Sequence, residues 1–571
     1  MPPAAPTFTS SSSTAVEEDT STSTVVLDVN ATDGSGGAAD ANVTYSLSGA
    51  DASDFSIDTS SGELSFVAVP DWNNPADTDT NNIYNLIVTA NNGSTTATQN
   101  ISIIVFPKTD FTGSEIAQQL GIDIDGEAAG DQSGYSVSTS AEGHTVAIGA
   151  TLNDGNGSSS GHVRVYRFNA GAWTQLGSDI NGEATDDRSG YSVSLSADGN
   201  TIAIGAILND GNGTNSGHVR VYEFNAGVWT QLGSDIEGEA ANDQSGYSVS
   251  LSANGNTVAI GAIANDGNGN SSGHVRVYEF NAGVWTQLGS DIDGEAVGDQ
   301  SGWSVSLSAD GNTVSIGARF NGANGTHSGH VRIYEFSAGA WSQLGSDIDG
   351  EAAGDGSGYS VSLSADGHIV AIGAIGNDEN GTDSGHVRIY EFNAGAWTQL
   401  GSDINGEAAN DFLGLSVSLS ADGNSVAIGA YLNDGNGTDS GHVRVYAFNA
   451  GARTQLGCDS DINGEAANDF SGLSVSLSAD GNTVAIGAPR NGGNGTDSGH
   501  VRVYELKLST VLWLGTVDMD WNNINNWNTG QVPLGSENVV IQNVTNQPII
   551  EASSSVNIGR LSMDNQSKLI V

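Results

Sequence analysis

The chain has 571 residues, of which 67 are Asp or Glu and only 16 are Lys or Arg, so its formal net charge is −51. Such a surface repels nucleic acids and anionic membranes and attracts cations, so we expect no nucleic-acid partner. The single cysteine, Cys458, excludes an internal disulfide, and no apolar run is long enough to span a membrane.

Residues 1–13 are rich in Pro, Ser and Thr and are expected to be a linker. They carry neither the basic nor the apolar region of a secretory signal, so we expect the sequence to be a mature or excised portion of a longer chain. Residues 14–107 then show alternating, β-branched segments separated by turn residues, which predict a β-sandwich. The predicted strands are 23–29, 42–48, 55–58, 62–69, 84–90 and 95–105.

This segment resembles a bacterial cadherin-like domain. The resemblance is carried, in family order, by Ala31-Thr32-Asp33, Asn42-Val43-Thr44-Tyr45-Ser46, Phe55-Ser56-Ile57-Asp58, Pro70-Asp71-Trp72-Asn73-Asn74-Pro75 and Tyr84-Asn85-Leu86-Ile87-Val88. It implies calcium sites at the domain ends, where calcium takes six to eight oxygen ligands. The matching ligand positions are Glu17 or Glu18, Asp33 and Asp71, with Asn42 alongside.

Three departures from the cadherin pattern leave an alternative open. Ser35 stands where a second Asp is usual, Asn73 replaces a Glu, and the closing Asp-x-Asn-Asp-Asn linker is missing from 105–110. The alternative is a sandwich held together by its apolar core alone.

A repeat fills 133–505, and its phase is marked by a Gly-His-Val-Arg tetrad. The seven histidines recur every 56 residues, except for one spacing of 58 caused by an insertion near Cys458: they are His162, His218, His274, His330, His386, His442 and His500. Each unit reads as four short strands, of the types YSVSLS, TVAIGA, HVRVYEF and WTQLGSDI, bounded by turn sequences. Four strands per unit, repeated in this way, predict the blades of a β-propeller.

The strand count predicts how the ring closes. After Glu505 the fourth strand type is missing, whereas an extra copy of it stands at 117–121, ahead of the first complete unit. We therefore expect this N-terminal strand to pair into the last blade, which removes an exposed sheet edge.

The repeat resembles the FG-GAP family, whose best-known members form the seven-bladed propeller of integrin α subunits. The resemblance is carried by Gly134-Tyr135, Gly302-Trp303 and Gly414-Leu415 before first strands, and by Ile-Gly-Ala after second strands, complete as Gly487-Ala488-Pro489 in the last copy. It implies a seven-bladed propeller over 114–507. The integrin calcium loop is here only Ala-Asp-Gly-Asn, so that site is not expected.

Residues 511–571 have a third composition, with Trp513, Trp521 and Trp527 among Asn and Asp. They resemble the WxG…DWNxxxNW…GxVP module of secreted bacterial proteins, and we expect a partial β module that continued in the natural chain. The fold class is therefore all-β: sandwich, propeller and partial module.

The loop after the fourth strand is the main candidate metal site of the propeller. Its carboxylates recur in all seven copies and at this spacing could gather around calcium; they are Asp123, Glu127 and Asp131 in one copy and Asp291, Glu295 and Asp299 in another. The alternative is that they cap turns and face the repeated Arg. His162 and Arg164 fall on one face of the third strand and are expected to pair between blades, with the Arg bonded, preferably in bidentate fashion, to a carboxylate of this loop.

Two other repeated features have both a structural and a binding interpretation. The Asn-Asp-Gly-Asn-Gly turns carry Asp at five positions, Asp154, Asp210, Asp266, Asp378 and Asp434, but Gly322 and Gly492 at two, which favours turn formation over metal binding. Tryptophans open the fourth strands, and packing against the neighbouring blade is favoured over sugar stacking. They are Trp173, Trp229, Trp285, Trp341 and Trp397.

Sevenfold repetition argues against one active site, because an enzyme needs a singular constellation of nucleophile, base and orienting group. We therefore expect a non-enzymatic, extracellular or cell-surface adhesion protein, with calcium as its ion and a protein or polysaccharide as its partner. The alternative is a carbohydrate-binding propeller of a larger secreted protein. A hydrolase is kept only for a part of the natural chain beyond 571.

Overall fold

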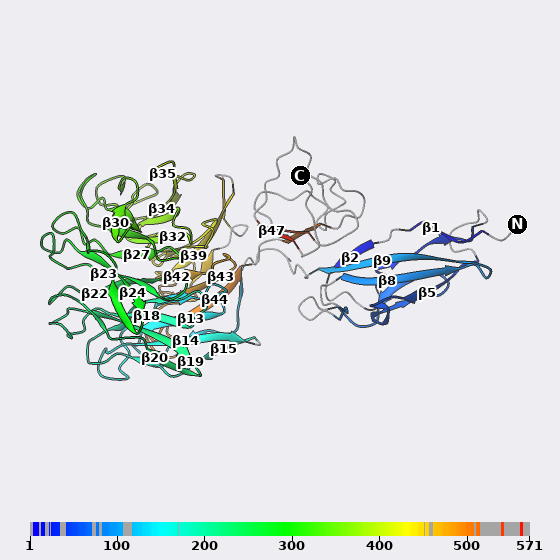
Figure 1. Ribbon diagram of the computed structural model, residues 1–571, viewed down its shortest axis with the longest axis horizontal. Helices are drawn as coiled ribbons and strands as arrows, with labels where there is room; N and C mark the ends of the chain where they lie inside the picture. Colours follow the sequence, from blue (N-terminus) through cyan, green and yellow to red (C-terminus); the bar gives the residue numbers. More distant parts are fainter. Residues whose placement is uncertain are drawn as a thin grey trace. The chain divides into compact units, whose positions relative to one another are not determined.

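The structure is a computed structural model of the full chain. It describes residues 4–10, 13–17, 22, 24–34, 42–70, 76–78, 83–106, 117–169, 171–449, 452–455, 461–506, 510–513, 538–541 and 560–563. The chain divides into two compact units, Met1–Gly113 with Leu508–Val571, and Ser114–Lys507 (Figure 1). Apart from one short 3₁₀ helix, η1 (Ala52–Asp54), all regular elements among the described residues are strands, which confirms the all-β class.

The N-terminal segment is a sandwich of antiparallel sheets with one parallel edge. The first sheet has the order β2 (Ser13–Glu17), β9 (Thr96–Phe106), β8 (Ile83–Asn91), β5 (Thr44–Ser48), with β2 parallel to β9. The second has the order β3 (Leu27–Asp28), β7 (Glu63–Phe66), β6 (Phe55–Ile57). A further pair joins β1 (Thr7–Phe8) to β4 (Ala31–Thr32), so part of the stretch expected to be a linker is a strand.

Alternation along these strands builds the core of the sandwich. Leu86, Val88 and Ala90 of β8 point inward and are at most 1% exposed, as residues two apart on a strand must share a face. Phe55, Phe66 and Tyr84 form an aromatic group with ring centroids 4.2–5.4 Å apart. The predicted strands at 42–48, 55–58, 62–69, 84–90 and 95–105 are confirmed, but of the described part of 23–29 only Leu27–Asp28 belongs to a sheet.

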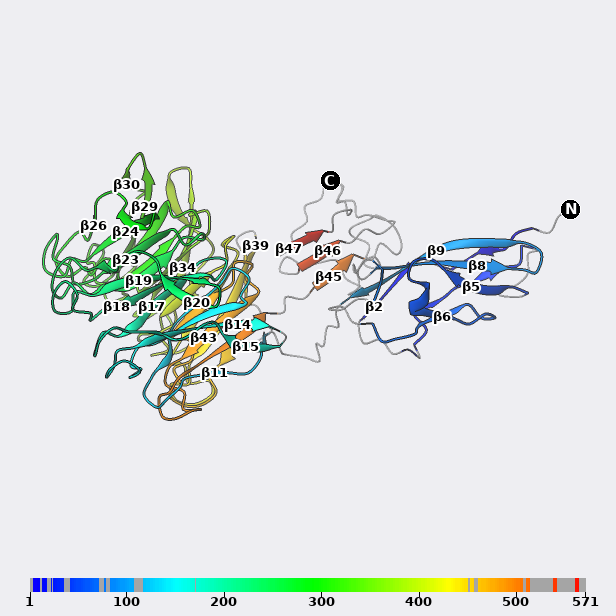
Figure 2. The same ribbon diagram turned by 60° about the horizontal axis from the view of Figure 1, so that its bottom comes forward.

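The repeat folds into seven five-stranded sheets, confirming the seven-bladed propeller (Figure 2). In each blade the first, second, third and fourth strands pair in sequence order, and a fifth short strand also pairs with the third. The predicted WTQLGSDI strand is thus divided in two. The first strands of successive blades contact one another and so surround the propeller axis.

The blades are numbered 1 to 7 and begin at β12, β17, β22, β27, β32, β37 and β42. The first strands are β12 (Ser133–Thr139), β17 (Ser189–Leu195), β22 (Ser245–Leu251), β27 (Ser304–Leu307), β32 (Ser360–Leu363), β37 (Ser416–Leu419) and β42 (Ser474–Leu477). The second strands are β13 (Thr145–Ala150), β18 (Thr201–Ala206), β23 (Thr257–Ala262), β28 (Thr313–Ala318), β33 (Ile369–Ala374), β38 (Ser425–Ala430) and β43 (Thr483–Ala488). The third strands are β14 (His162–Asn169), β19 (His218–Asn225), β24 (His274–Asn281), β29 (His330–Ser337), β34 (His386–Asn393), β39 (His442–Asn449) and β44 (His500–Leu506).

The outer strands complete each blade, and those of blade 7 come from the N-terminal side of the repeat. The fourth strands are β15 (Ala172–Gln175), β20 (Val228–Gln231), β25 (Val284–Gln287), β30 (Ala340–Gln343), β35 (Ala396–Gln399), β40 (Ala452–Gln455) and, in blade 7, β10 (Ala117–Gln119). The fifth strands are β16 (Ile180–Asn181), β21 (Ile236–Glu237), β26 (Ile292–Asp293), β31 (Ile348–Asp349), β36 (Ile404–Asn405), β41 (Ile462–Asn463) and, in blade 7, β11 (Ile124–Asp125).

The ring closes as the strand count predicts. β10 pairs antiparallel with β44, with Ala117 opposite Leu506, and β11 pairs with the start of the same strand. Ile124 of β11 is 4% exposed and packs with residues of blades 7 and 1. A circle of seven backbone hydrogen bonds of 2.8–2.9 Å also runs from blade to blade and returns to its start, joining Ala141, Ala197, Ala253, Ala309, Ala365, Ala421 and Ala479.

Small residues near the axis also join the blades, and the sequence did not predict these contacts. The Ser136 hydroxyl donates to the Gly190 carbonyl of the next blade at 2.8 Å, and the Ser138 hydroxyl accepts from the Leu195 N–H at 2.9 Å. A Cβ added at Gly149 would lie 2.1 Å from the Gly190 oxygen. The repeated serines and the glycine of Ile-Gly-Ala therefore let neighbouring blades approach closely.

In the C-terminal segment the structure describes three parallel strands, β45 (Thr510–Trp513), β46 (Asn538–Ile541) and β47 (Arg560–Met563). The tryptophans at 521 and 527 lie outside the described residues. Among the described residues, no helix is long and apolar enough to cross a membrane.

Candidate functional site: histidine clusters between the blades

Each third strand begins with the histidine of the repeat and carries its arginine two residues later. In β14, His162 and Arg164 share one face, while Val163 and Val165 share the other, because side chains alternate along a strand. Neighbouring blades cover both faces, so all four residues are buried: His162 is 1% exposed and Arg164 is 5% exposed. The same burial holds in the other six blades.

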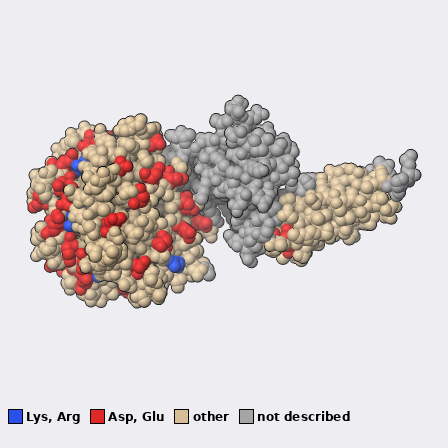
Figure 3. Space-filling model, viewed as in Figure 1, with Lys and Arg blue, Asp and Glu red and all other residues tan. Residues whose placement is uncertain are grey.

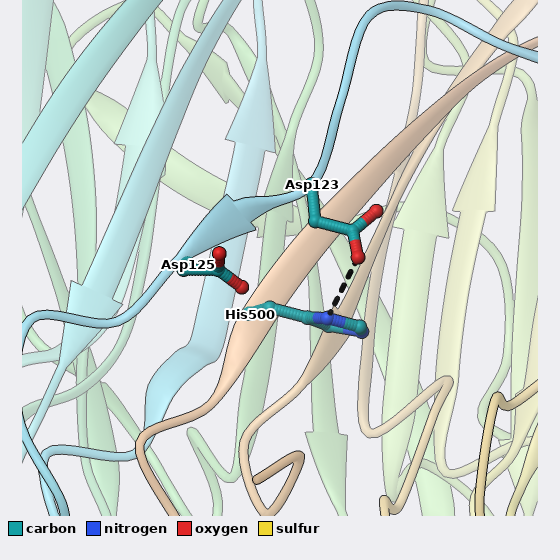
Figure 4. Close-up of side chains that lie close together, drawn as sticks. All are labelled: Asp123, Asp125 and His500. Atoms are coloured by element: carbon teal, nitrogen blue, oxygen red, sulfur yellow. Dashed lines mark ion pairs between the residues drawn. The ribbon is translucent and has the colours of Figure 1, made fainter. Parts of the chain in front are cut away.

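In five blades, two carboxylates from different blades lie within 4.0 Å of the histidine. In blade 2, His218 Nδ1 lies 3.8 Å from Asp235 Oδ2 of its own blade and 3.9 Å from Glu183 Oε2 of blade 1. Blades 3, 4, 5 and 7 repeat this geometry with separations of 3.6–3.9 Å. In blade 7 the clustered side chains are Asp123, Asp125 and His500, with Asp123 pointing to the imidazole (Figure 4). A mixed cluster of this kind therefore recurs between blades around the ring.

Burial keeps these imidazoles neutral. It lowers the pKa of His218 from 6.5 to about 4, with a further contribution from the Arg220 charge, and the nearby Asp235 and Asp187 oppose the shift only in part. The pKa values of His162, His274, His386 and His500 are lowered to about 4 for the same main reason. Burial also raises the pKa of the Glu183 carboxyl, against the effect of Arg220. At neutral pH each imidazole therefore offers a free electron pair.

Six of the seven repeated arginines link the blades through a backbone carbonyl rather than a bidentate carboxylate pair, whereas Arg444 contacts the carboxylates of Glu407 and Asp461. Arg332 NH2 donates to the Asp293 carbonyl of the preceding blade at 2.7 Å, and its NH1 donates to the Tyr334 hydroxyl at 2.7 Å. The carboxylate of Glu295 lies 3.7 Å from NH1 and is 43% exposed. The fifth strand thus presents a backbone carbonyl where a second carboxylate oxygen was expected.

Replacing Arg332 by methionine is expected to lower the free energy of unfolding by about 2 kcal/mol, as for other hydrogen bonds made by a charged group. The loss stays modest because Glu295 can regain water once its partner is removed. Urea denaturation followed by tryptophan fluorescence measures it, and Arg188→Met is the matched control because Arg188 is exposed. Equal midpoints for the two variants would contradict an interblade role for Arg332.

The structure separates the three loop carboxylates that were expected to share one calcium ion. Asp291 lies beside His274 of its own blade, whereas Glu295 lies beside His330 of the next blade. Asp299 is 4% exposed, and its Oδ2 accepts from the Ala296 N–H and the Asn321 amide at 3.0 Å.

The other copy follows the same plan. Asp123 faces His500, Glu127 faces His162, and Asp131 accepts from the Ala128 N–H. The side chains that meet between blades thus include a histidine as well as carboxylates. The sequence predicted only that this histidine takes part in interblade pairing.

Of the expected cadherin ligands, the structure describes only part. Asp33 is half-buried, and its carbonyl accepts from the Asn92 amide at 2.9 Å. Glu17 ends β2, but its side chain is outside the described part of the chain, as are Glu18 and Asp71. A calcium site at these residues stays a prediction.

The remaining repeated groups take their structural roles. Asp154 Oδ1 accepts from the Ser159 N–H at 2.8 Å, closing its own turn, and the equivalent Asp residues do the same. Trp285 donates from Nε1 to the Leu232 carbonyl of the preceding blade at 2.8 Å and packs against that blade. Turn formation and interblade packing are therefore confirmed for these two features.

An aromatic arc around the axis is the least symmetric feature of the propeller. Tyr135, Tyr191, Tyr247, Trp303 and Tyr359 follow one another with centroids 4.6–5.4 Å apart, whereas blades 6 and 7 have leucine at this position. Arg319 lies over Trp303, with its guanidinium carbon 3.4 Å from the ring centroid. The sequence showed these residues as the Gly-aromatic pairs but did not indicate that they form a continuous arc.

Acidic side chains spread over the visible face of the propeller, with few Lys or Arg between them (Figure 3). Such a surface attracts cations to the openings between the blades, where the glutamates of the clusters are 42–51% exposed.

Comparison with known families agrees with this architecture. A cadherin domain model matches residues 12–106, and an FG-GAP repeat model matches 181–222, 237–278, 348–390, 405–447 and 463–504. The chain is therefore a modular all-β protein with a cadherin domain followed by an FG-GAP propeller. This combination indicates an extracellular adhesion or binding module.

A comparison with solved structures gives partial likenesses to three proteins, among others. A protein from Bacteroides uniformis provisionally described as a 6-phosphogluconolactonase is 14% identical (TM-score 0.44; 63% of this chain and 92% of that one covered). U3-55K is 11% identical, with a TM-score of 0.41 and coverage of 69% of this chain and 100% of that one. The periplasmic gluconolactonase PpgL of Pseudomonas aeruginosa is 16% identical, with a TM-score of 0.40 and coverage of 60% of this chain and 95% of that one. A comparison with curated protein sequences gives no match.

Proposed function

We propose that this protein is a non-enzymatic adhesion protein of the cell surface or extracellular space, which binds a protein or polysaccharide partner and uses calcium in its cadherin domain. The observation that carries the proposal is the equivalence of the blades: the buried polar groups recur in all seven interfaces rather than forming one singular site. Equivalent blades also repeat their exposed turns around the ring, which suits multivalent contact with an extended polymer, because linked weak sites raise the overall affinity.

The adhesion proposal is tested with beads coated with the full chain and exposed to cells and to immobilised extracellular polysaccharides. We expect retention in excess calcium and several-fold weaker retention in chelator. Retention that is equal in both solutions would contradict the role of calcium, and no retention on any surface would contradict adhesion.

Calcium binding is tested by thermal unfolding of the same chain. An ion that binds only the folded state at 100 times its Kd stabilises by about 2.7 kcal/mol. Asp33→Asn is expected to remove most of this shift, whereas Asp28→Asn, at an exposed position of β3, should keep it. Equal shifts in the two variants would contradict the cadherin-type site.

A second candidate, carbohydrate binding by the propeller, is favoured by one pocket. It lies between blades 2 and 3 and combines an aromatic wall, Tyr278 and Trp285, with the carboxylates of Asp235 and Glu237. Aromatic faces with nearby hydrogen-bonding groups suit a sugar ring. A glycan array probed with the full chain tests this candidate, and Trp285→Ala should abolish the signal. Because Trp285 also packs against blade 2, near-UV circular dichroism of the variant must show that the propeller remains folded.

A further inference from the structure

We propose that the clusters between the blades are metal sites, each binding one divalent transition-metal ion such as zinc through a histidine Nδ1, a glutamate of the preceding blade and an aspartate of the histidine's own blade. This inference is independent of the adhesion function and of calcium in the cadherin domain.

The positions of the donor atoms match those of ligands that share one ion. In blade 3, His274 Nδ1 lies 3.8 Å from Glu239 Oε2 and 3.9 Å from Asp291 Oδ2. These separations are too long for hydrogen bonds. Two ligands of a tetrahedral zinc, each about 2.0–2.2 Å from the ion, are separated by roughly 3.4 Å. The three donor atoms of this cluster lie within 4.8 Å of one another, so small side-chain movements would bring them to one ion.

Three of the seven histidines are left wholly unsatisfied by the rest of the described protein. Neither ring nitrogen of His218, His386 or His500 has a hydrogen-bond partner within the described ranges, although the three side chains are only 1% exposed. An unpaired buried polar atom costs about 1–3 kcal/mol. Coordination at Nδ1, which points toward the two carboxylates, would satisfy one of the two nitrogens in each ring.

The charges at each cluster also call for a cation. Around His218 stand the carboxylates of Glu183, Asp235 and Asp187, against the single positive charge of Arg220. Arg220 NH1 approaches the other oxygen of Glu183, Oε1, at 3.6 Å, so Oε2 remains directed at the histidine. The arginine thus acts as a positioning residue for the glutamate.

The chemistry of the donors selects the class of ion. Calcium and magnesium prefer oxygen ligands only, whereas imidazole nitrogen with carboxylate oxygen suits zinc and related transition metals. The partly exposed glutamate and aspartate, 42% and 31% in blade 3, provide a path for the ion.

The test is the zinc content of the full chain, purified in chelator, loaded with zinc and separated from excess ion. We expect close to seven zinc ions per chain and no comparable uptake of calcium at these sites. The triple variant His218→Gln, His330→Gln, His442→Gln should lose about three. His368→Gln is the matched control, because this histidine is 56% exposed and lies outside the clusters.

Crystals of the unmodified chain soaked in zinc give a second measurement that does not depend on the variants folding. Anomalous difference peaks at the interfaces, within about 2.0–2.2 Å of histidine Nδ1, are the expected result. An uptake of at most one ion per chain, equal uptake by the triple variant and the control, or anomalous peaks only at surface carboxylates would overturn the proposal.

Discussion

Replacing Ile124 by aspartate is expected to lower the free energy of unfolding of the propeller by at least about 4 kcal/mol, because the change removes a buried side chain and places a charge in the core. Ile124 lies on β11, far from blade 7 in sequence, yet packs against Val501 and Val503 of that blade and against Val146 and Ile148 of blade 1. The variant therefore opens the ring where it is closed.

The matched control lies two residues earlier. Ile122 is 82% exposed, so Ile122→Asp should change the stability by less than about 0.5 kcal/mol. Urea denaturation followed by near-UV circular dichroism compares the two. If both variants unfold at the same urea concentration, the N-terminal segment does not close the propeller in solution.

Acid is expected to destabilise the metal-free propeller well before its carboxylates are fully protonated. Burial lowers the pKa of five of the buried histidines from 6.5 to about 4 in the folded chain; they are His162, His218, His274, His386 and His500. Between these values the unfolded chain binds more protons, so stability is full above about pH 6.5 and falls as the pH decreases toward 4. Each histidine contributes up to about 1.4 kcal/mol per pH unit within this window.

Four glutamates of the clusters act in the opposite direction, because a carboxyl whose pKa is raised by burial favours the folded chain once it is protonated; they are Glu183, Glu239, Glu351 and Glu465. The ordinary pKa of a glutamate, about 4.3, lies well below that of a free histidine, about 6.5, so the histidines dominate the slope in the upper part of the range. Urea unfolding in chelator from pH 7.5 to 4.5 measures it, and His274→Gln should flatten the slope where His368→Gln does not. A free energy of unfolding that does not change with pH across this range would contradict the prediction, because it would mean that protonating the imidazoles does not destabilise the fold.

Much of the architecture followed from local sequence features. The period of 56 residues, the strand and turn signals within it and the displaced fourth strand predicted seven blades and their closure, because each depends on short-range patterns repeated many times. The sandwich strands from 42 onward were predicted for the same reason. β1 and β2 were missed, since two- to five-residue strands with little alternation depend on the partner that they pair with.

The sequence predicted the residues of the candidate site but not which of them lie together. The sequence placed Asp291, Glu295 and His274 in the right elements, but it grouped the carboxylates by their nearness in the chain. In the fold, Asp291 and Glu295 lie on either side of β26 and at different interfaces. Each of them lies beside the histidine of a different third strand. Residues that are neighbours in a turn can face opposite sides of a blade, and no pattern within one repeat records this.

The sequence by itself determined the all-β class, the number of blades and the strand that closes the ring, because period, alternation and turn chemistry are local properties. Only the tertiary structure decided which residues meet between the blades: the serine and glycine contacts at the axis, the arginine bonded to a backbone carbonyl, and the glutamate, histidine and aspartate around one point. Each of these joins residues of two blades, and the distance between them is set by how one sheet packs on the next.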